Sequence, residues 1–510
     1  MKAMPISVNI FKNSSWNLIL FISQGLAGVF ASILIARYLG PTLMGEYSFI
    51  IWLVGIMVIL AGMGLPNTIT KFISELTGSG NKETAQAIYA RLLQIQCIVP
   101  LFIAIILIVI FYPTLSPIKR DYYLIAFLAF TPLCISAFFT SAFHGLQNFR
   151  ITSIVGSVIN LIQLLLVVAC IVLDVGLKGL LAIPLVSGIF QVLLLIKYIP
   201  FKIKSPFKIP KDNSSNIIKY TLSVYWTIIL SMIVWQKSEV FFLKIYSTPE
   251  DIAFYSIAFN ISMTMIGLTA LFSTVIFPVL SNYYGAGDRE GIQNVYNKSI
   301  KAIVIFYLPI CIIVIAIARP IVLLMYSSRY LAVSPPLIIL MMSTIFSALG
   351  MLFANLTLAV NRTDIQVKYG TLAAVANIAL DFILIPRYGA VGAALANSSV
   401  HIIATSIYIG VINRQLSFSF PTREIVMCLL PNIPLAVILC FFGNHYQNLF
   451  GIVLVLILTV FVYPLLLFIF KTITNDDIRI AKEVSAILPA PYEKMLNSIF
   501  DRIPIRQETH

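Results

Sequence analysis

Long apolar runs recur along almost the whole chain, and they restrict what it can fold into. A helix needs about 20 mostly apolar residues to cross a membrane, and such runs follow one another from Trp16 to Phe470 without a long polar interval. Apolar residues make up 59% of the 510 residues and charged residues only 11%, whereas a soluble domain carries about 25% charged residues. The sequence therefore excludes a soluble globular enzyme and predicts one polytopic membrane protein.

The apolar runs are long enough for fourteen membrane-spanning helices. We place them, to within a few residues, near 16–37, 46–66, 90–112, 122–142, 152–173, 178–197, 220–243, 252–278, 302–325, 334–358, 370–386, 391–412, 425–442 and 449–470. The predicted fold class is an all-α polytopic membrane protein.

Basic residues outnumber acidic ones, 34 against 20, which gives a net charge of +14. They lie in short hinges between the apolar runs and not in a patch interleaved with aromatic residues, so they predict membrane topology and no nucleic-acid binding. Most of them fall on the cytoplasmic side if the N-terminus is cytoplasmic, which predicts that both termini are cytoplasmic. The six cysteines lie inside apolar runs without metal-ligand spacing, so we expect no disulfide framework, metal site or cofactor.

Two short patterns repeat at nearly the same offset. Tyr-x-x-Pro followed by Tyr-Ser occurs at residues 38–48 and again at 246–256, and a Gly-x-x-Gly pattern at 176–179 returns at 389–392. An even number of spans per repeat preserves orientation, so the patterns predict two pseudo-symmetric six-helix lobes followed by two C-terminal helices. The predicted divisions are an N-terminal lobe (1–198), a basic cytoplasmic linker (199–219), a C-terminal lobe (220–414), spans thirteen and fourteen (415–470) and a cytoplasmic tail (471–510).

The opening hairpin and the eleventh-to-twelfth spans carry a family resemblance. The first contains Arg-Tyr-Leu-Gly-Pro at 37–41 and Gly-Glu-Tyr at 45–47; the second contains Asn377, Asp381 and Pro-Arg-Tyr-Gly at 386–389. These motifs resemble the polysaccharide- and oligosaccharide-exporting flippases (O-antigen flippase-like) of the MOP (multidrug/oligosaccharidyl-lipid/polysaccharide) exporter superfamily.

The resemblance implies two helical bundles around a central cationic cavity, alternating access, and a prokaryotic plasma (inner) membrane. The implied activity is movement of polyprenyl-diphosphate-linked oligosaccharide from the cytoplasmic to the outer leaflet, for surface polysaccharide assembly. The implied partners are this lipid-linked oligosaccharide, membrane lipids, a coupled H⁺ or Na⁺, and the glycan polymerase or glycosyltransferases of the same pathway.

Charged residues inside a span are functional candidates, because they cost several kcal/mol unless they line water or find partners. Lys237 and Glu239 lie within the seventh predicted span. We expect Lys237 to be a counter-charge for the substrate diphosphate and Glu239 to balance a basic residue or carry a coupled proton. The alternatives for both are a structural ion pair with another helix and a position at the end of the span, nearer to water.

Asp381 lies four residues after Asn377 and therefore on the same helical face. It is a candidate for binding a proton or Na⁺, and a hydrogen-bonded structural aspartate is the alternative. Arg37, Lys244 and Arg319 lie at predicted outer ends of spans and are candidates for binding the diphosphate, although basic residues there also extend to lipid headgroups.

Three functions compete. A lipid-linked oligosaccharide flippase fits the basic residues that border the membrane. A multidrug cation antiporter of the same superfamily would favour an acidic, aromatic-lined cavity. A membrane glycan polymerase, ligase or glycosyltransferase would need carboxylate or histidine constellations on a sizeable loop, but the predicted outer loops are short and the four histidines are scattered. The prediction is therefore a transporter and not an enzyme.

Overall fold

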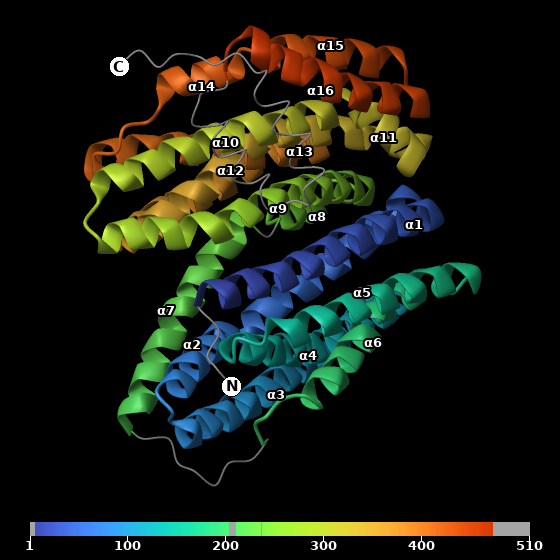
Figure 1. Cartoon of the computed structure of the whole chain (residues 1–510). Helices are drawn as coiled ribbons and strands as arrows, with labels where there is room; N and C mark the ends of the chain where they lie inside the picture. Colours follow the sequence, from blue (N-terminus) through green and yellow to red (C-terminus); the bar gives the residue numbers. More distant parts are fainter. Residues whose placement is uncertain (1–5, 203–210, 236, 473–510) are drawn as a thin grey trace, which may run out of the picture. The chain divides into compact units, whose positions relative to one another are not determined.

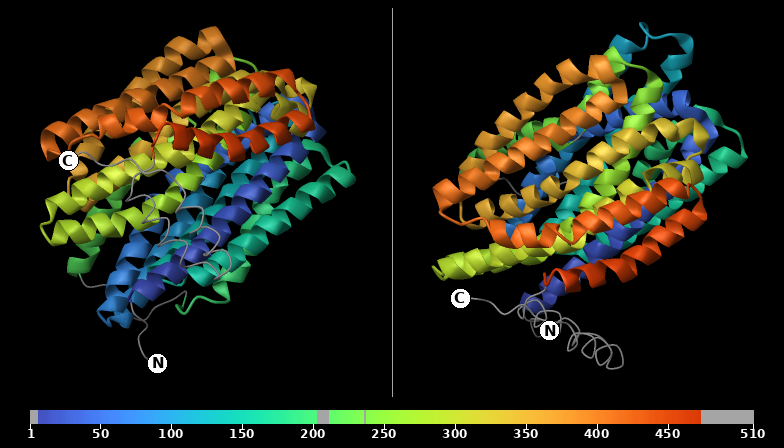
Figure 2. Two further views of the ribbon diagram at one scale, coloured as in Figure 1. Left: turned by 45° about the horizontal axis from the view of Figure 1, so that its top comes forward. Right: turned by 90° about the horizontal axis from the view of Figure 1, so that it is seen from above.

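Helices form almost all of the structure (Figures 1 and 2). This computed structural model describes residues 6–202, 211–235 and 237–472, and these residues contain no strand. The predicted all-α class is confirmed. The middle of the predicted linker, residues 203–210, and nearly all of the predicted tail, residues 473–510, lie outside the described residues.

Contacts between helices divide the chain into two units. The first comprises Met1–Thr264 and Val367–Val400, and the second comprises Met265–Gln366 and His401–His510. The first unit contains α1 (Ile6–Gly62), α2 (Leu65–Gly78), α3 (Lys82–Phe111), α4 (Pro117–Gly145), α5 (Phe149–Val172), α6 (Gly176–Ile196), α7 (Lys211–Trp235), α8 (Glu239–Tyr246), the start of α9 (Pro249–Gly285) and the middle of α13 (Thr363–Val411). The second contains the rest of α9 and α13 together with α10 (Arg289–Ala316), α11 (Ala318–Met325), the 3₁₀ turn η1 (Ser328–Val333), α12 (Ser334–Ala359), the π turn η2 (Ile412–Leu416), α14 (Thr422–Leu429), α15 (Asn432–His445) and α16 (Leu449–Ile469).

The helices accommodate the fourteen predicted spans. Ten helices among the described residues are long and apolar enough to cross a membrane. Two of these, α1 and α13, are kinked in the middle, and each therefore provides two predicted spans. The two remaining predicted spans correspond to α7–α8 and to α9. α7 begins at Lys211, inside the stretch predicted as a linker.

Glycines with positive φ make both kinks. Gly40 has φ 73° and ψ 171°, and Pro41 follows it; Gly389 has φ 53° and ψ −127°. Glycine adopts positive φ at little cost because it has no Cβ. Proline then suits the first turn of the next helical arm, since its missing N–H would have no helical partner there. Each kink coincides with a hinge that the sequence predicted between two spans.

The helix α2 was not predicted. The second arm of α1 ends at Gly62, and Gly64, with φ 72°, is the N-cap of α2, which begins at Leu65. Leu65, Ile69 and Phe72 are buried on one face of α2, while Lys71 is exposed on the other. This stretch is too polar and too short to cross a membrane, so the pattern of apolar runs did not predict a helix here.

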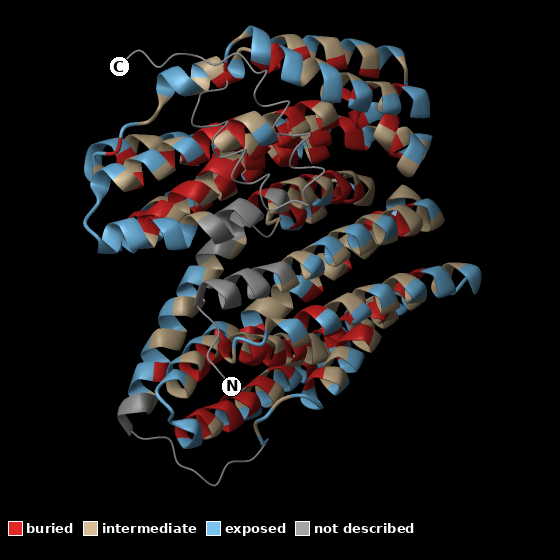
Figure 3. Cartoon of the chain, viewed as in Figure 1, coloured by how far each residue is buried: buried red, intermediate tan, exposed pale blue. Residues whose placement is uncertain are grey.

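Each unit has its own apolar core (Figure 3). In the first unit, Ile69 of α2, Ile88 of α3 and Phe138 of α4 belong to one buried cluster. In the second, residues of α10, α15 and α16 pack together, among them Ile312, Leu435 and Val455. Large apolar side chains also remain exposed on the outside of both units, such as Val172 at 77% and Phe461 at 73%. Such exposure is expected where helices face lipid instead of water.

One turn occurs twice with the same geometry. Gly-Ser-Gly-Asn-Lys-Glu at 78–83 joins α2 to α3, and Gly-Ala-Gly-Asp-Arg-Glu at 285–290 joins α9 to α10, 207 residues later. Gly80 and Gly287 both have positive φ, 79° and 71°. Side-chain oxygens of Asn81 and Asp288 accept from the N–H groups of Thr84 and Gly291, so both turns cap the following helix in the same way.

Each repeated turn is followed by a glutamine that holds a distant segment. The side-chain amide of Gln86 donates to the Lys202 carbonyl at 2.6 Å and accepts from the Lys202 N–H at 3.0 Å. Gln293 makes the same two bonds with Ser419, both at 2.8 Å. The two segments follow the sixth and twelfth predicted spans. This shared arrangement supports the predicted internal repeat at positions outside the Tyr-x-x-Pro and Gly-x-x-Gly patterns.

Candidate functional site

The seventh predicted span is broken where its charged residues lie. α7 ends at Trp235 and α8 begins at Glu239. Lys237 between them has φ 56°, a value that non-glycine residues seldom adopt. The prediction of a continuous helix over 220–243 is therefore wrong. Because the helix is interrupted, the side chains of Lys237 and Glu239 enter two different environments.

Lys237 reaches a cavity in the first unit. Its Nζ donates to Oδ1 of Asn260 at 2.6 Å and lies 5.2 Å from the centre of the Phe259 ring. The cavity has a volume of about 390 Å³ and is bounded by both arms of α1, by α9 and by Lys237. Small residues such as Gly28 make room for it on the first arm of α1, and Tyr47 and Trp52 line it on the second. The cavity thus combines one cation with aromatic surfaces.

Glu239 is fully buried and is held by amides from both arms of α13. Its Oε1 accepts from Nδ2 of Asn377 at 3.2 Å and from Nδ2 of Asn397 at 2.8 Å. Ser238 donates from Oγ to Oδ1 of Asn377 at 3.3 Å, which orients that amide. Asn377 precedes the kink at Gly389 and Asn397 follows it. The kink therefore brings two amides of one long helix to the same carboxylate.

Asp381 lies next to this group and is also fully buried. Among the described residues, neither of its carboxylate oxygens has a hydrogen-bond partner, and the same is true of Oε2 of Glu239. The two carboxylates and Tyr255 interact electrostatically with one another. An unpaired buried carboxylate costs several kcal/mol or takes up a proton. The arrangement is chemically suited to a proton or to a monovalent cation bound by oxygen atoms.

Lys244 and Glu46 form an ion pair between α8 and the second arm of α1. Nζ of Lys244 lies 3.2 Å from Oε1 of Glu46, and Nζ of Lys119 lies 3.4 Å from the same oxygen. Lys244 also stands 4.9 Å from the centre of the Phe49 ring. Lys244 and Lys119 therefore share one carboxylate, and the three groups together keep a net positive charge.

The two Tyr-x-x-Pro hairpins touch at equivalent positions. Thr42 Oγ1 donates to Oε1 of Glu250 at 2.5 Å, and these two residues are 208 positions apart, as are Tyr38 and Tyr246. This hydroxyl lowers the pKa of the Glu250 carboxyl below its usual range, because it stabilises the charged form. Residues related by a twofold axis contact each other only close to that axis. The Thr42–Glu250 contact therefore marks the position of the predicted pseudo-twofold between the hairpins.

The other two predicted site residues, Arg37 and Arg319, are exposed. Arg37 is exposed on α1, three residues before the kink at Gly40. Arg319 is exposed at the start of α11 in the second unit. Nothing tests the predicted roles of Arg37, Lys244 and Arg319 in diphosphate binding, and these stay predictions.

Sequence reasoning missed three side chains of the site. Asn260, Asn397 and Tyr255 are uncharged, and the search of the spans considered ionisable residues. A search for carboxamides inside apolar runs would have found both asparagines, because an amide at membrane depth also needs hydrogen-bond partners. Tyr255 carried no such signal, because the sequence pattern explained it as part of the repeated Tyr-Ser pair and gave no sign of a contact with Glu239.

These observations define the class of protein as a polytopic helical membrane protein with a charged centre at membrane depth. The profile of the polysaccharide biosynthesis protein family matches residues 10–284, and a profile named MatE matches residues 225–383. The chain belongs to the polysaccharide biosynthesis protein family. The resemblance inferred from the sequence motifs is confirmed.

Two relatives and one solved structure resemble this chain at low sequence identity. The probable low-salt glycan biosynthesis flippase Agl15 of Haloferax volcanii is 24% identical over 215 residues, which is 42% of this chain and 44% of that protein. The match therefore spans less than half of that relative's length. Stage V sporulation protein B of Bacillus subtilis is 23% identical over 489 residues, 88% of this chain and 92% of that protein. The structure of the lipid II flippase MurJ in an inward closed conformation superposes with a TM-score of 0.76 at 19% identity, covering 89% of this chain and 98% of that one. At that identity the superposition shows a shared fold.

Proposed function

We propose that this chain is a flippase that carries polyprenyl-diphosphate-linked oligosaccharide from the cytoplasmic to the outer leaflet by alternating access. Its family membership, the name of the Haloferax relative and the fold shared with a lipid II flippase support this proposal. No covalent bond is made or broken. The protein supplies two alternating conformations and a site that favours the charged head group over the membrane interior.

The observation that carries the proposal is the cavity that Lys237 enters. A cation at membrane depth is costly unless it serves an anionic ligand or a pathway. Lys237 donates to the neutral Asn260 and lies near the Phe259 ring, and it also interacts electrostatically with Glu239, whose Oε1 is bound by Asn377 and Asn397. A diphosphate would offset this charge. Aromatic surfaces such as Trp52 suit the sugar that follows. Lys237 is thus the proposed counter-charge, with Arg37, Lys244 and Arg319 as further proposed contacts.

Ion coupling is assigned to Glu239 and Asp381. Both are buried, both have unpartnered oxygens among the described residues, and they repel one another when both are ionised. Binding a proton or Na⁺ would remove this repulsion. Glu239 begins α8, two residues after Lys237. Binding of a proton or Na⁺ to the acidic pair would therefore be transmitted to Lys237 along the backbone.

The multidrug cation antiporter is the second candidate. The MatE profile covers residues 225–383, which contain Lys237, Glu239 and Asp381, and an acidic pair would suit a cationic drug. The sign of the charge in the cavity separates the two candidates, because Lys237 would repel such a drug. A polymerase or ligase remains the third candidate and would be revealed by a covalent product.

Reconstitution into proteoliposomes tests the proposal. A fluorescent polyprenyl-diphosphate oligosaccharide is placed in one leaflet, and its arrival in the other is followed with and without a proton or sodium gradient. We expect gradient-stimulated transfer of the intact lipid. Transport of ethidium in place of the glycolipid would favour the antiporter, and chain extension of the glycan would favour the enzyme.

Topology and partners belong to the same proposal. We expect a plasma membrane location with both termini in the cytoplasm, as the distribution of basic residues predicts. The glycosyltransferases that make the lipid-linked substrate and the polymerase that consumes it are the expected pathway partners.

A further inference from the structure

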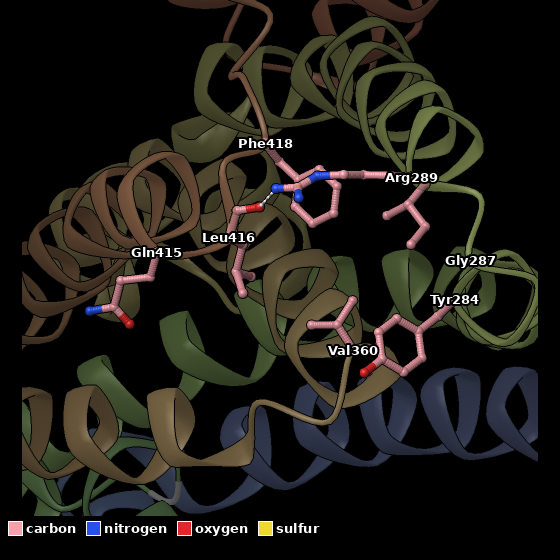
Figure 4. Close-up of a pocket in the computed structure, with 8 residues that line it drawn as sticks. Tyr284, Gly287, Arg289, Val360, Gln415, Leu416 and Phe418 are labelled. Carbon is pink, nitrogen blue, oxygen red and sulfur yellow. Dashed lines mark hydrogen bonds between the residues drawn. The ribbon is translucent and has the colours of Figure 1, made fainter.

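The second repeated turn borders a cavity in the second unit (Figure 4). The cavity has a volume of about 310 Å³ and lies between the α9–α10 turn, Val360 at the end of α12, and the segment that follows α13. It is separate from the cavity that Lys237 enters, with which it shares no residue. The positive-inside pattern places this turn on the predicted cytoplasmic side.

Arg289 is fixed at the edge of this cavity. Its Nη2 donates to the Leu416 carbonyl at 2.5 Å, and its guanidinium carbon lies 5.4 Å from the centre of the Phe418 ring. Figure 4 shows the guanidinium extended across to Leu416. A guanidinium has five N–H donors, and among the described residues the Leu416 carbonyl is the acceptor that it meets. The remaining donors form a planar fork of the kind that binds phosphate.

The backbone that meets Arg289 has an unusual conformation. Residues Ile412–Leu416 form a π turn, and Ser417 after it has φ 53°. Gln293 holds the next residues in place through its two bonds with Ser419. These features direct the Leu416 carbonyl and the Phe418 ring toward Arg289, so the guanidinium is positioned before any ligand arrives.

The rest of the lining is apolar apart from the phenol of Tyr284 and the carboxamide of Gln415. Ile292, Phe418 and Val360 are buried, and Tyr284 is exposed at the edge. Asp288 and Glu290 flank Arg289 in the sequence, and Asp288 uses Oδ1 to cap α10 by accepting from the Gly291 N–H. A cavity with a cationic edge and an apolar floor matches a molecule that carries an anionic group next to an apolar part.

The first turn provides an internal contrast. Lys82 stands at the position of Arg289, Thr77 at that of Tyr284, and Ala85 at that of Ile292. Lys82 is exposed, and its ammonium lacks the planar fork of a guanidinium. The capping of α3 matches that of α10, so the two turns differ in the residues that line the cavity and not in their backbone.

We propose that this cavity binds the phosphate of an anionic phospholipid head group, with Arg289 on the phosphate and Ile292 and Phe418 against the start of the apolar part. Basic pockets between spanning helices at the cytoplasmic surface are suited to such head groups. Phosphate binding would hold the α9–α10 turn to the segment after α13. This inference does not depend on the transported substrate.

Binding is tested on the purified full chain in detergent, by native mass spectrometry and by thermal unfolding with added phosphatidylglycerol, phosphatidylcholine or inorganic phosphate. We expect phosphatidylglycerol to bind and to raise the unfolding temperature of the wild type. Arg289→Ala should weaken this binding about tenfold or more, as expected for the loss of hydrogen bonds to a charged group. Lys82→Ala is the matched control and should bind as the wild type does.

Arg289→Lys keeps the charge and the fold but lacks the fork, and we expect a loss of several-fold. This variant carries the test if Arg289→Ala does not fold. Equal binding of phosphatidylglycerol by wild type and both Arg289 variants would overturn the proposal, as would equal binding of phosphatidylcholine. Displacement of phosphatidylglycerol by millimolar inorganic phosphate, with the same thermal shift, would assign the site to free phosphate and overturn the lipid.

Discussion

The first and seventh predicted spans occupy equivalent places in the internal repeat, and they differ at their centres. The offset of 208 that relates Tyr38 to Tyr246 also relates Val29 to Lys237 and Ala31 to Glu239. The first span is continuous through Val29 and Ala31 as far as the kink at Gly40. The seventh is broken between Trp235 and Glu239, and its two charges lie at the break.

The same contrast holds between the fifth and eleventh spans. At the offset of 213, Asn377 corresponds to Leu164 and Asp381 to Val168. The buried polar group is therefore present in one repeat and absent at the equivalent positions of the other. Since an apolar residue is the less costly choice at membrane depth, the polar group is not required for the repeat to fold. This supports a functional role for it.

Removing the cation should have the largest effect on transport. Lys237→Ala leaves the cavity without a positive charge, and we expect flipping to fall by about ten- to a hundredfold, the loss typical of hydrogen bonds to a charged group. Transfer in proteoliposomes measures this, with the amount of folded protein checked by size exclusion. Val29→Ala, at the equivalent position, is the control and should transport normally. If Lys237→Ala flips the lipid at the wild-type rate, Lys237 is not part of the substrate site.

Neutralising the acidic pair should abolish the coupling of flipping to the ion gradient. Flipping of the glycolipid in the absence of a gradient should remain. Glu239→Gln can still accept hydrogen bonds from Asn377 and Asn397, but it cannot exchange a proton or attract Na⁺. We expect the stimulation of flipping by the effective gradient, about fivefold or more for a typical coupling energy, to disappear in this variant and in Asp381→Asn. Val168→Ala is the control for Asp381. An unchanged gradient response in both acidic variants would contradict the assignment.

Two equivalent glycines should respond differently to alanine. Gly176 and Gly389 both have positive φ, but a Cβ at Gly176 meets nothing within 4 Å, whereas at Gly389 it would stand 2.5 Å from Oδ2 of Asp251. Gly176→Ala should cost about 1–2 kcal/mol of backbone strain, and Gly389→Ala a further 1–3 kcal/mol for the forced displacement. Thermal unfolding in detergent compares them. Equal losses would mean that Asp251 moves aside freely.

The hairpin contact should give the smallest effect, and one that depends on pH. Thr42→Val removes the hydroxyl that lowers the pKa of Glu250. A carboxyl with a lowered pKa stabilises the folded state above its usual value of about 4.3 and loses that contribution as the pH falls through the lowered value. The variant should therefore be slightly less stable than the wild type at pH 7, and the difference should vanish at the lowest pH at which the protein stays folded.

Thr114→Val is the control for this measurement, because Thr114 donates to a neutral group, the Phe111 carbonyl. Its effect on the unfolding temperature should be independent of pH. A difference between wild type and Thr42→Val that stays constant down to low pH would show that Glu250 does not depend on Thr42.

Several elements of the fold could be read from the sequence because their signal is local. Apolar runs of about 20 residues located the spans, and Gly-Pro at 40–41 and Pro386 with Gly389 located the hinges within α1 and α13. The amphipathic α2 and the break at Lys237 were missed. The search required apolar length, which α2 lacks, and no glycine or proline announced a positive φ at Lys237.

The site divides along the same line. Lys237, Glu239 and Asp381 were found because a charge within an apolar run stands out in the sequence by itself. Asn397 and Tyr255 were not, because each matters only through its position beside Glu239 in the folded protein. Asn397 is more than a hundred residues away from Glu239 in the sequence, and Tyr255 belongs to a different helix, α9. The predicted role of Lys244 now competes with its ion pair to Glu46.

By itself, the sequence determined that this protein is helical, crosses a membrane many times, repeats itself and carries a few charges at membrane depth. These properties follow from the cost of burying polar groups in lipid, which each segment meets on its own. The tertiary structure alone decided which charges have partners. Lys244 meets a carboxylate, Glu239 meets two amides, and Asp381 meets neither among the described residues. Partnership depends on which helices pack side by side, and that is fixed by the kinks and by side-chain packing over the whole unit.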